Sequence, residues 1–178
     1  MNRKVQNMAN PRHARVKTAL GEVTLVSDGD ALTGLYFPGH WHLPNESGFG
    51  IRVEAVTDEV LARTKDELDA FLDGDRQSFD VPVRARGDAF SEKVWAMLQE
   101  IPYGQTTSYG ALAERLGDRR LAQRVGQAVG RNPVCVIIPC HRVVGADGSL
   151  TGYAGGLERK RFLLELEEPA EKSRSRLF

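Results

Sequence analysis

Hydrophobic and polar residues alternate from Val16 to Phe37, and two polar, glycine-containing stretches interrupt this alternation. Such a pattern is typical of antiparallel strands joined by hairpins. After a loop over residues 38–50, apolar residues between Thr57 and Gly74 recur at helical spacing, and residues 79–87 return to a short strand pattern. We therefore expect a small mixed α/β domain over residues 13–86, with no obvious chemistry in it.

The second half of the chain is predicted to be mainly helical. A first helix runs from Gly87 to just before Pro102, and its buried face carries Phe90, Val94, Trp95 and Leu98. Two shorter helices follow, from Ser108 to about Leu116 and from about Arg120 to Gly130, with Gly117 in the turn between them. Two short helices around a glycine turn form a helix-turn-helix, so we expect an α/β chain whose domain over residues 87–168 binds DNA.

The second helix of this motif carries a polar stripe formed by Arg120, Arg124, Gln127 and Arg131. A solvated helix face is the simplest interpretation of such a stripe. However, the same helix contains Ala122, Gly126 and Gly130, and each glycine destabilises a helix by about 1 kcal/mol. Small residues are useful where a phosphate backbone or a groove wall must come close, so we favour DNA contact.

Composition places the chain among ordinary globular proteins. Its formal net charge is zero, so any attraction to nucleic acid must be local, and between Tyr103 and Arg131 five arginines face only two acidic residues. No stretch of 18 apolar residues exists, and the N-terminus lacks the apolar core of a signal peptide. We expect a soluble, cytoplasmic protein with flexible tails at residues 1–12 and 169–178.

The chain contains two cysteines, Cys135 and Cys140. The β-branched run from Val134 to Ile138 predicts a buried strand that ends at Pro139, and such a strand would hold the cysteines too far apart for a disulfide. We therefore expect free thiols in a reducing compartment. The histidines and cysteines lack zinc-site spacing, so no metal is expected, with the pair His40 and His42 as the alternative.

Cys140 stands where the predicted buried strand ends, at the edge of a pocket. A Cys-His dipeptide alone proves little, because most such cysteines are buried hydrophobic residues. The surrounding segment is more specific: Ile138 to Val144 reads IPCHRVV, and Gly152 to Leu157 reads GYAGGL. Together with Arg131-Asn132-Pro133, these segments resemble the signature of the O6-alkylguanine-DNA alkyltransferases. The likeness covers about 80 residues and is weaker in the N-terminal part.

The resemblance implies a direct repair reaction. Cys140 would accept the alkyl group from O6-alkylguanine, or from O4-alkylthymine, in DNA. His141 would deprotonate Cys140 through a water molecule, and Glu167 would orient His141. Asn132 would brace the turn before the cysteine, and Tyr109 would donate a hydrogen bond or proton to the departing base. The product is a thioether that water does not hydrolyse, so each molecule acts once and needs no cofactor.

The same resemblance implies how the base is held. The backbone carbonyls of Cys140 and Val143 and the amide near Ala154 would read the guanine edge, and Tyr153 would line the pocket. Thr151 lies two residues before Tyr153, where a β-branched side chain fills space that a glycine would leave open. We therefore expect O6-benzylguanine to react more slowly than O6-methylguanine.

The partner implied by the resemblance is double-stranded DNA, approached from the minor groove with the damaged nucleotide rotated out of the stack. Ala122, Gly126 and Ala128 supply the small residues for that approach, and Arg131 ends the polar stripe. The family places an arginine in the gap left by the flipped base. This chain has Gln123 at that position and an arginine one residue later, at Arg124, so either residue could fill the gap or flipping is weaker.

Three rival functions fit parts of the pattern. A non-catalytic protein that binds alkyl lesions would lack the acceptor thiol, which argues against this reading because Cys140 is present. An alkylation-sensing helix-turn-helix regulator would need further modules. A cysteine hydrolase would turn over repeatedly, whereas an alkyltransferase stops after one reaction. We expect a monomer.

Overall fold

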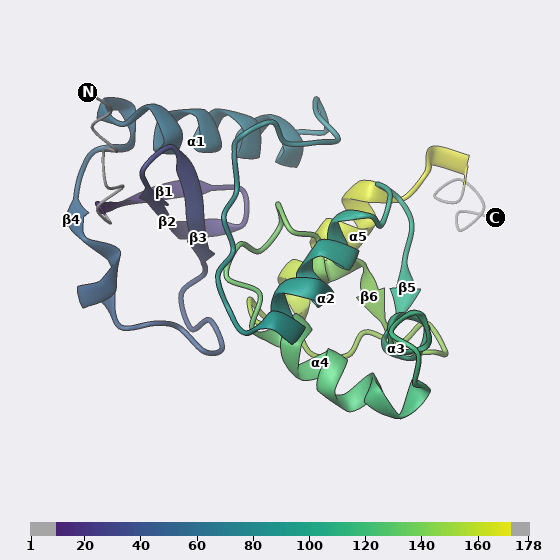
Figure 1. Cartoon of the computed structure of the whole chain (residues 1–178). Coiled ribbons are helices and arrows are strands. Elements are labelled where there is room, and N and C mark those ends of the chain that lie inside the picture. The colour runs from purple at the N-terminus through teal and green to yellow at the C-terminus, as the bar shows by residue number, and fades with distance from the viewer. Residues whose placement is uncertain (1–9, 172–178) are drawn as a thin grey trace, which may run out of the picture.

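The computed structural model describes residues 10–171, and its N-terminal part is built on a four-stranded sheet (Figure 1). Strands β1 (Pro11–Thr18), β2 (Gly21–Asp28) and β3 (Ala31–Tyr36) pair antiparallel through tight hairpins, as the alternating pattern predicted. The short strand β4 (Ile51–Arg52) pairs in parallel with β1 at the edge of the sheet. The strand order is β3-β2-β1-β4.

Three details of this part differ from the expectation. β1 begins at Pro11 and takes in two residues assigned to the tail; residues 1–9 and 172–178 lie outside the described residues. The predicted loop contains the 3-10 helix η1 (Glu46–Phe49), and β4 and η2 (Ala55–Thr57) follow it. The strand predicted at residues 79–87 is wrong, because only Val83 bridges to Leu32 there and the neighbouring Pro82 has no N–H to donate.

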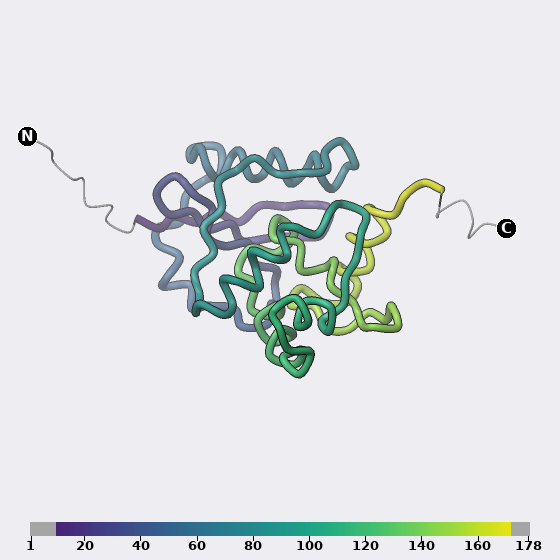
Figure 2. The backbone as a smooth tube through the Cα atoms, turned by 45° about the vertical axis from the view of Figure 1, so that its right-hand side comes forward, coloured from purple at the N-terminus to yellow at the C-terminus, as the bar shows by residue number. Residues whose placement is uncertain are grey.

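Helix α1 (Glu59–Leu72) lies along the sheet, as Figures 1 and 2 show, with the C-terminal helices gathered on another side. Asp58 caps its N-terminus by accepting a hydrogen bond from the Leu61 amide. Leu61, Leu68 and Phe71 form its buried face at helical spacing. This helix confirms the prediction for residues 57–74.

The C-terminal part is mainly helical, as expected. Its elements are α2 (Ala89–Gln99), β5 (Thr107–Ser108), α3 (Tyr109–Arg115), η3 (Arg119–Leu121), α4 (Ala122–Gly130), η4 (Cys140–Arg142), β6 (Val143–Val144) and α5 (Leu157–Glu167). Helices α3 and α4 pack together as a helix-turn-helix, and Gly117 turns the chain with a φ of 101°. The second helix starts slightly later than predicted, because η3 comes first.

The buried strand predicted at residues 134–138 is wrong in one respect. These residues are largely buried, but the backbone turns back on itself: Val136 has a φ of 73°, and the Ile138 amide donates to the Val134 carbonyl at 2.9 Å. A run of β-branched residues predicts burial, and it does not exclude a buried loop held by other groups. The chemical centre therefore follows a folded-back loop and not a strand.

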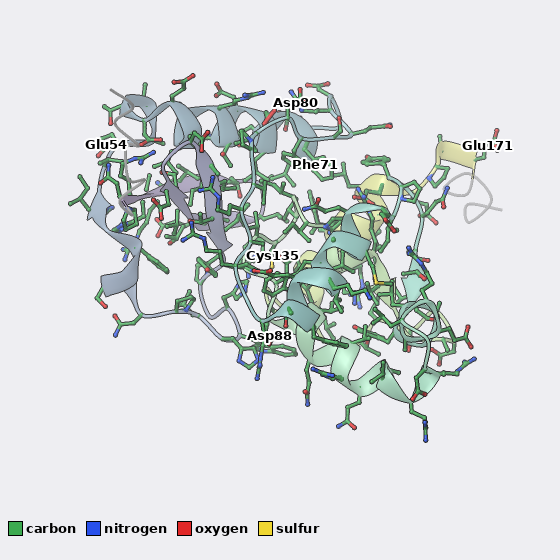
Figure 3. All side chains as sticks on the ribbon, in the orientation of Figure 1. Glu54, Phe71, Asp80, Asp88, Cys135 and Glu171 are labelled. Carbon is green, nitrogen blue, oxygen red and sulfur yellow. The ribbon has the colours of Figure 1, made fainter. Side chains whose placement is uncertain are left out.

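One hydrophobic core extends through both parts of the chain. The Leu35 amide donates to the Pro133 carbonyl at 2.8 Å, so β3 is joined directly to the loop before the cysteine. In Figure 3, Cys135 lies between the strands and the helices. The division into domains at residue 87 remains a prediction.

Within residues 10–171, no helix has the length and apolar character needed to cross a membrane.

Candidate active site

Cys140 is the first residue of η4, directly after Pro139. Its amide donates to the Ile138 carbonyl at 2.8 Å, which closes a tight turn and fixes the position of the side chain. The residue is 3% exposed. The candidate acceptor is thus held rigidly, just below the surface.

The sulfur atom of Cys140 lies 3.9 Å from that of Cys135, and both cysteines are free. The expectation that the two thiols are far apart is wrong, because the loop at residues 134–138 folds back and brings them together. The contact between the two thiols lowers the pKa of the Cys140 thiol, and the same contact, followed by burial, raises the pKa of Cys135. Cys140 is therefore the thiol that ionises first.

The two residues after Cys140, His141 and Arg142, both bind the buried carboxylate of Glu167. Glu167, at the end of α5, accepts from His141 Nε2 at 2.7 Å and from Arg142 Nη2 and Nε at 2.8 and 2.9 Å. Arg142 also donates to the Ile101 carbonyl at 2.7 Å. A buried bidentate arginine–carboxylate pair is geometrically specific, so Glu167 and its partners hold one another in place.

Burial keeps the imidazole of His141 neutral. Burial lowers the pKa of His141 more strongly than the hydrogen bond to Glu167 raises it. Because Glu167 occupies Nε2, the other ring nitrogen, Nδ1, is the one without a hydrogen-bond partner among the described residues. A neutral imidazole with a free nitrogen can accept a proton, which is what a general base requires.

Asn132 stands at the base of the loop. Its Nδ2 donates to the Ile138 carbonyl at 2.8 Å, and its Oδ1 accepts from the Val134 amide at 3.0 Å. The side chain, which is buried, thus joins both ends of the segment that folds back before Cys140. A buried amide with both ends paired fixes a loop more firmly than apolar packing alone.

A cavity of about 600 Å³ lies along helix α4, and Cys140, His141 and Asn132 do not line it. Tyr109 and Thr151 line it, and the Thr151 hydroxyl donates to the Tyr109 hydroxyl at 3.0 Å. Burial, and then the nearby negative charge of Cys140, raise the pKa of Tyr109, so its phenol stays protonated. Tyr109 thus lines the cavity and is also close enough to Cys140 for its pKa to be affected by that charge.

Helix α4 supplies another wall of the cavity. Its lining residues include Ala122, Gln123 and Gly126, with Arg131 at the end of the helix. Arg124 is not among them, because its guanidinium lies 3.9 Å from the centre of the Phe90 ring on α2. Of the two candidates for the gap left by a flipped base, Gln123 faces the cavity.

The other predicted substrate-binding residues are Val143, Tyr153 and Ala154. Val143 pairs with Thr107 between β6 and β5, and its carbonyl accepts a hydrogen bond from Lys160. Ala154 and Tyr153 are buried, and the Tyr153 ring packs near Phe37 with ring centres 6.3 Å apart. None of the three lines the cavity.

Sequence reasoning left Lys160 out of the site. This fully buried residue of α5 donates from Nζ to the carbonyls of Val143 and Thr151, at 2.7 and 3.0 Å. Burial lowers the pKa of Lys160 to about 8. The ammonium group ties the cavity wall to the helix that also carries Glu167. The spacing of Lys160 from the leucines of α5 is the only sequence signal of its burial, and exposed lysines in amphipathic helices often have the same spacing.

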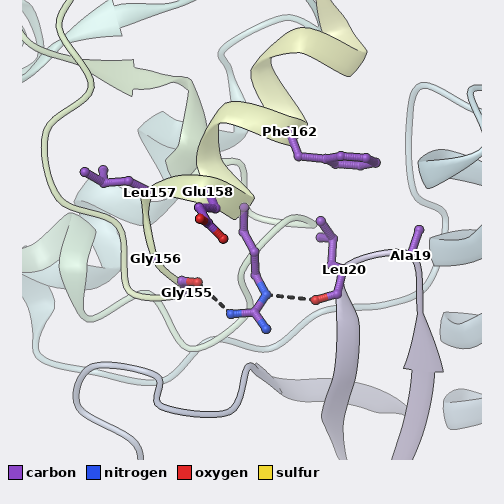
Figure 4. A pocket seen from close by; sticks show the side chains of 8 residues that line it. Ala19, Leu20, Gly155, Gly156, Leu157, Glu158 and Phe162 are labelled. Carbon is purple, nitrogen blue, oxygen red and sulfur yellow. Dashed lines mark hydrogen bonds between the residues drawn. The ribbon is translucent and has the colours of Figure 1, made fainter.

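A second cavity, of about 480 Å³, lies between the β1–β2 turn and the start of α5 (Figure 4). Arg159 donates to the carbonyls of Leu20 and Gly155 there, both at 2.8 Å, as the dashed lines mark. None of the predicted site residues lines this cavity.

Within residues 10–171, no group of three or more His, Cys, Asp or Glu side chains is placed to hold a metal ion. The Nδ1 atom of His40 accepts a hydrogen bond from the Phe37 amide.

Known proteins share both the sequence and the fold of this chain. Residues 89–169 match the family described as "6-O-methylguanine DNA methyltransferase, DNA binding domain". The methylated-DNA–protein-cysteine methyltransferase of Mycobacterium bovis is 40% identical over 159 residues, which cover 86% of this chain and 90% of the relative. The inducible enzyme of that name from Bacillus subtilis is 42% identical, covering 78% of this chain and 82% of the relative.

A solved structure gives the same result for the fold. The crystal structure of Mycobacterium tuberculosis OGT in complex with DNA is similar with a TM-score of 0.80 and 38% identity. The match covers 92% of this chain and 94% of that chain, so it includes the sheet as well as the helices. The thiol, the buried histidine–carboxylate pair and the helix-turn-helix agree with these likenesses. The chain belongs to the methylated-DNA–protein-cysteine methyltransferase family.

Proposed function

We propose that this chain repairs DNA by transferring an alkyl group from the O6 atom of guanine to the sulfur of Cys140, once per molecule. The observation that carries the proposal is the buried Cys140 thiol, adjacent in sequence to the His141–Glu167 pair and close to a cavity walled by helix α4. The cytoplasm suits this reaction because two thiols only 3.9 Å apart stay reduced in a reducing compartment.

The reaction requires one proton to leave and another to arrive. His141 takes the Cys140 proton through a water molecule, and the thiolate attacks the alkyl carbon. The new bond is S–C, the broken bond is C–O, and the electron pair of the broken bond leaves on guanine. Tyr109 donates a proton or hydrogen bond to the departing base. The thioether product is stable in water, so the protein stops after one transfer.

DNA binds to the helix-turn-helix. Ala122 and Gly126 allow a duplex to approach α4, and the damaged nucleotide rotates into the cavity at a cost of a few kcal/mol. Because Cys140 is 3% exposed and does not line the cavity, side chains must move before the base reaches the sulfur.

The decisive experiment measures intact mass after incubation with a duplex containing O6-methylguanine. We expect one added methyl group per protein, mapping to Cys140 after digestion, and none on Cys140→Ala. Cys135→Ala serves as the matched control and should still take up one methyl group. Repeated release of product would instead indicate a hydrolase, and lesion binding without mass gain would indicate a non-catalytic binder.

Gln123→Arg should speed repair of duplex DNA. Gln123 lines the cavity that receives the base, whereas Arg124 is stacked on Phe90, so an arginine at position 123 would place a cation next to the gap left in the duplex. We expect the rate on duplex DNA to rise roughly three-fold, a difference of under 1 kcal/mol. The rate with free O6-benzylguanine should stay unchanged. Equal rates of both proteins on the duplex would contradict the prediction.

Thr151→Gly should widen the range of accepted alkyl groups. The substitution removes the β-branched side chain and its hydrogen bond to Tyr109, which leaves space at the cavity wall. The rate ratio of O6-benzylguanine to O6-methylguanine substrates should rise about ten-fold, the effect expected when a steric contact is relieved. Thr151→Ser keeps the hydroxyl and is the control. An unchanged ratio in Thr151→Gly would remove Thr151 from substrate selection.

A further inference from the structure

Trp41 comes from the N-terminal part of the chain and stands at the cavity of the candidate site. It lines the cavity together with Tyr109, Gln123 and Thr151. Its amide donates to the Ala154 carbonyl at 3.1 Å, which ties the segment after β3 to the cavity wall. The sequence around Trp41 carries no recognised signal, so only the fold brings the residue here.

The outer edge of the indole, at Cη2 and Cζ3, is supported by Gly152 of the cavity wall. A Cβ atom placed on Gly152 would lie 2.7 Å from Cη2 of Trp41, closer than real Cβ contacts allow. Glycine at position 152 therefore permits the ring to lie directly against the backbone. The indole is placed by this contact as well as by its amide hydrogen bond.

The preceding residue anchors the segment in the core. His40 is buried, its Nδ1 accepts from the Phe37 amide at 3.3 Å, and its ring stacks on Phe37 with centres 6.2 Å apart. Its Nε2 lies 4.0 Å from the Cys135 sulfur. The base of the segment thus packs against the loop that positions Cys140, and Trp41 extends from a fixed point.

The remaining surface of Trp41 is open, since the residue is 53% exposed. A tryptophan held in place, half exposed and facing a cavity offers a flat apolar surface to a planar ligand. Nucleobases stack on such rings whatever their sequence, because every base has a π-face. The cavity also exposes polar groups of Gln123, Gln127 and Arg131, which suit the sugar and phosphate of the same nucleotide.

We propose that Trp41 is a substrate-contacting residue whose exposed indole packs against the nucleotide rotated out of the duplex. This inference rests on the proposed function and deepens it. The N-terminal part of the chain then takes part in lesion recognition directly. The occupant is the extruded nucleotide and not the intact duplex, because the cavity reaches Tyr109, whose pKa is affected by the charge of Cys140 and which the reaction needs as a donor.

The test combines Trp41→Ala and Trp41→Phe with Phe162→Ala, which removes an exposed aromatic side chain from the other cavity. Binding is measured in a Cys140→Ala background to duplexes with and without O6-methylguanine, and transfer rates are measured with Cys140 intact. Trp41→Ala should lower the preference for the lesion duplex about ten-fold, since one stacked base contributes roughly that factor. Trp41→Phe should keep most of the preference, and Phe162→Ala should keep all of it.

Tryptophan fluorescence gives an independent readout. The protein has two tryptophans, and the other, Trp95, is buried with its indole N–H bound to the Ala128 carbonyl. The lesion duplex should quench the emission of the Cys140→Ala protein, and Trp41→Phe should abolish this change. An unaltered lesion preference in Trp41→Ala, or an equal loss on both duplexes, overturns the proposal. Failure of the proposed function would appear separately, as no alkyl transfer by the unsubstituted protein.

Discussion

Replacing Glu167 with glutamine is expected to lower the free energy of unfolding by about 3–5 kcal/mol, the usual cost of breaking a buried ion pair by removing one partner. Glutamine keeps the size of the side chain but loses the charge that neutralises Arg142. The Arg142 guanidinium would remain buried with only the Ile101 carbonyl as a strong acceptor. Urea unfolding at neutral pH measures the change, followed by circular dichroism.

A matched control is available on the same helix. Glu165 is exposed and lies two residues earlier on α5, so Glu165→Gln should change the free energy of unfolding by less than about 0.5 kcal/mol. Glu167→Gln should also slow alkyl transfer by about ten-fold or more, because His141 loses the carboxylate that orients it. A destabilisation no larger than that of Glu165→Gln would show that the buried pair does not hold the site together.

The same carboxylate predicts a dependence on pH. Hydrogen bonds from His141 and Arg142 outweigh burial and lower the pKa of Glu167 to about 2, from an ordinary value of 4.5. The folded state binds this proton less tightly than the unfolded state, so the stabilisation is complete above pH 4.5 and is lost as the pH falls toward 2. The difference corresponds to about 3 kcal/mol. Glu167→Gln should lack this part of the acid transition.

Much of the architecture follows from local patterns. Alternation in β1 to β3 and helical spacing in α1 and α2 are properties of neighbouring residues, and they predict the elements well because tertiary packing uses the same faces. The run from Val134 to Ile138 is a segment whose backbone path local patterns do not predict. Its β-branched residues predict burial correctly, but the backbone direction depends on Asn132, whose side chain joins the two ends of the loop.

The same distinction applies to the candidate site. Cys140, His141 and Tyr109 belong to short segments that can be recognised along the chain. The contact between Cys135 and Cys140 depends on the loop, and Trp41 lies far in sequence from Tyr109 and Thr151 on the same cavity, so no local pattern contains either contact. The sequence shows Arg142 only as part of the motif around Cys140. Its pairing with Glu167 could not be predicted, because it depends on where α5 packs in the fold.

Lys160→Met should damage the cavity wall while leaving the thiol and its histidine in the chain. The substitution removes the donor shared by the Val143 and Thr151 carbonyls. Each buried acceptor left without a partner costs about 1–3 kcal/mol, and the loss is partly offset because a buried ammonium group no longer has to be desolvated. We expect a net loss of about 2 kcal/mol and alkyl transfer slowed by about ten-fold.

The dependence on pH separates the role of Lys160 from simple packing. Burial lowers its pKa from 10.5 to about 8, so between these values the unfolded state binds more protons than the folded state. Stability contributed by this group must therefore rise as the pH increases from 8 to 10.5, since the neutral amine is buried at less cost. Unfolding curves across this range should show the rise in the unsubstituted protein and in Arg161→Met, whose exposed side chain is the control, and not in Lys160→Met. If Lys160→Met followed the same rise, another group would be responsible, and burial would not lower the pKa of Lys160 in the folded protein.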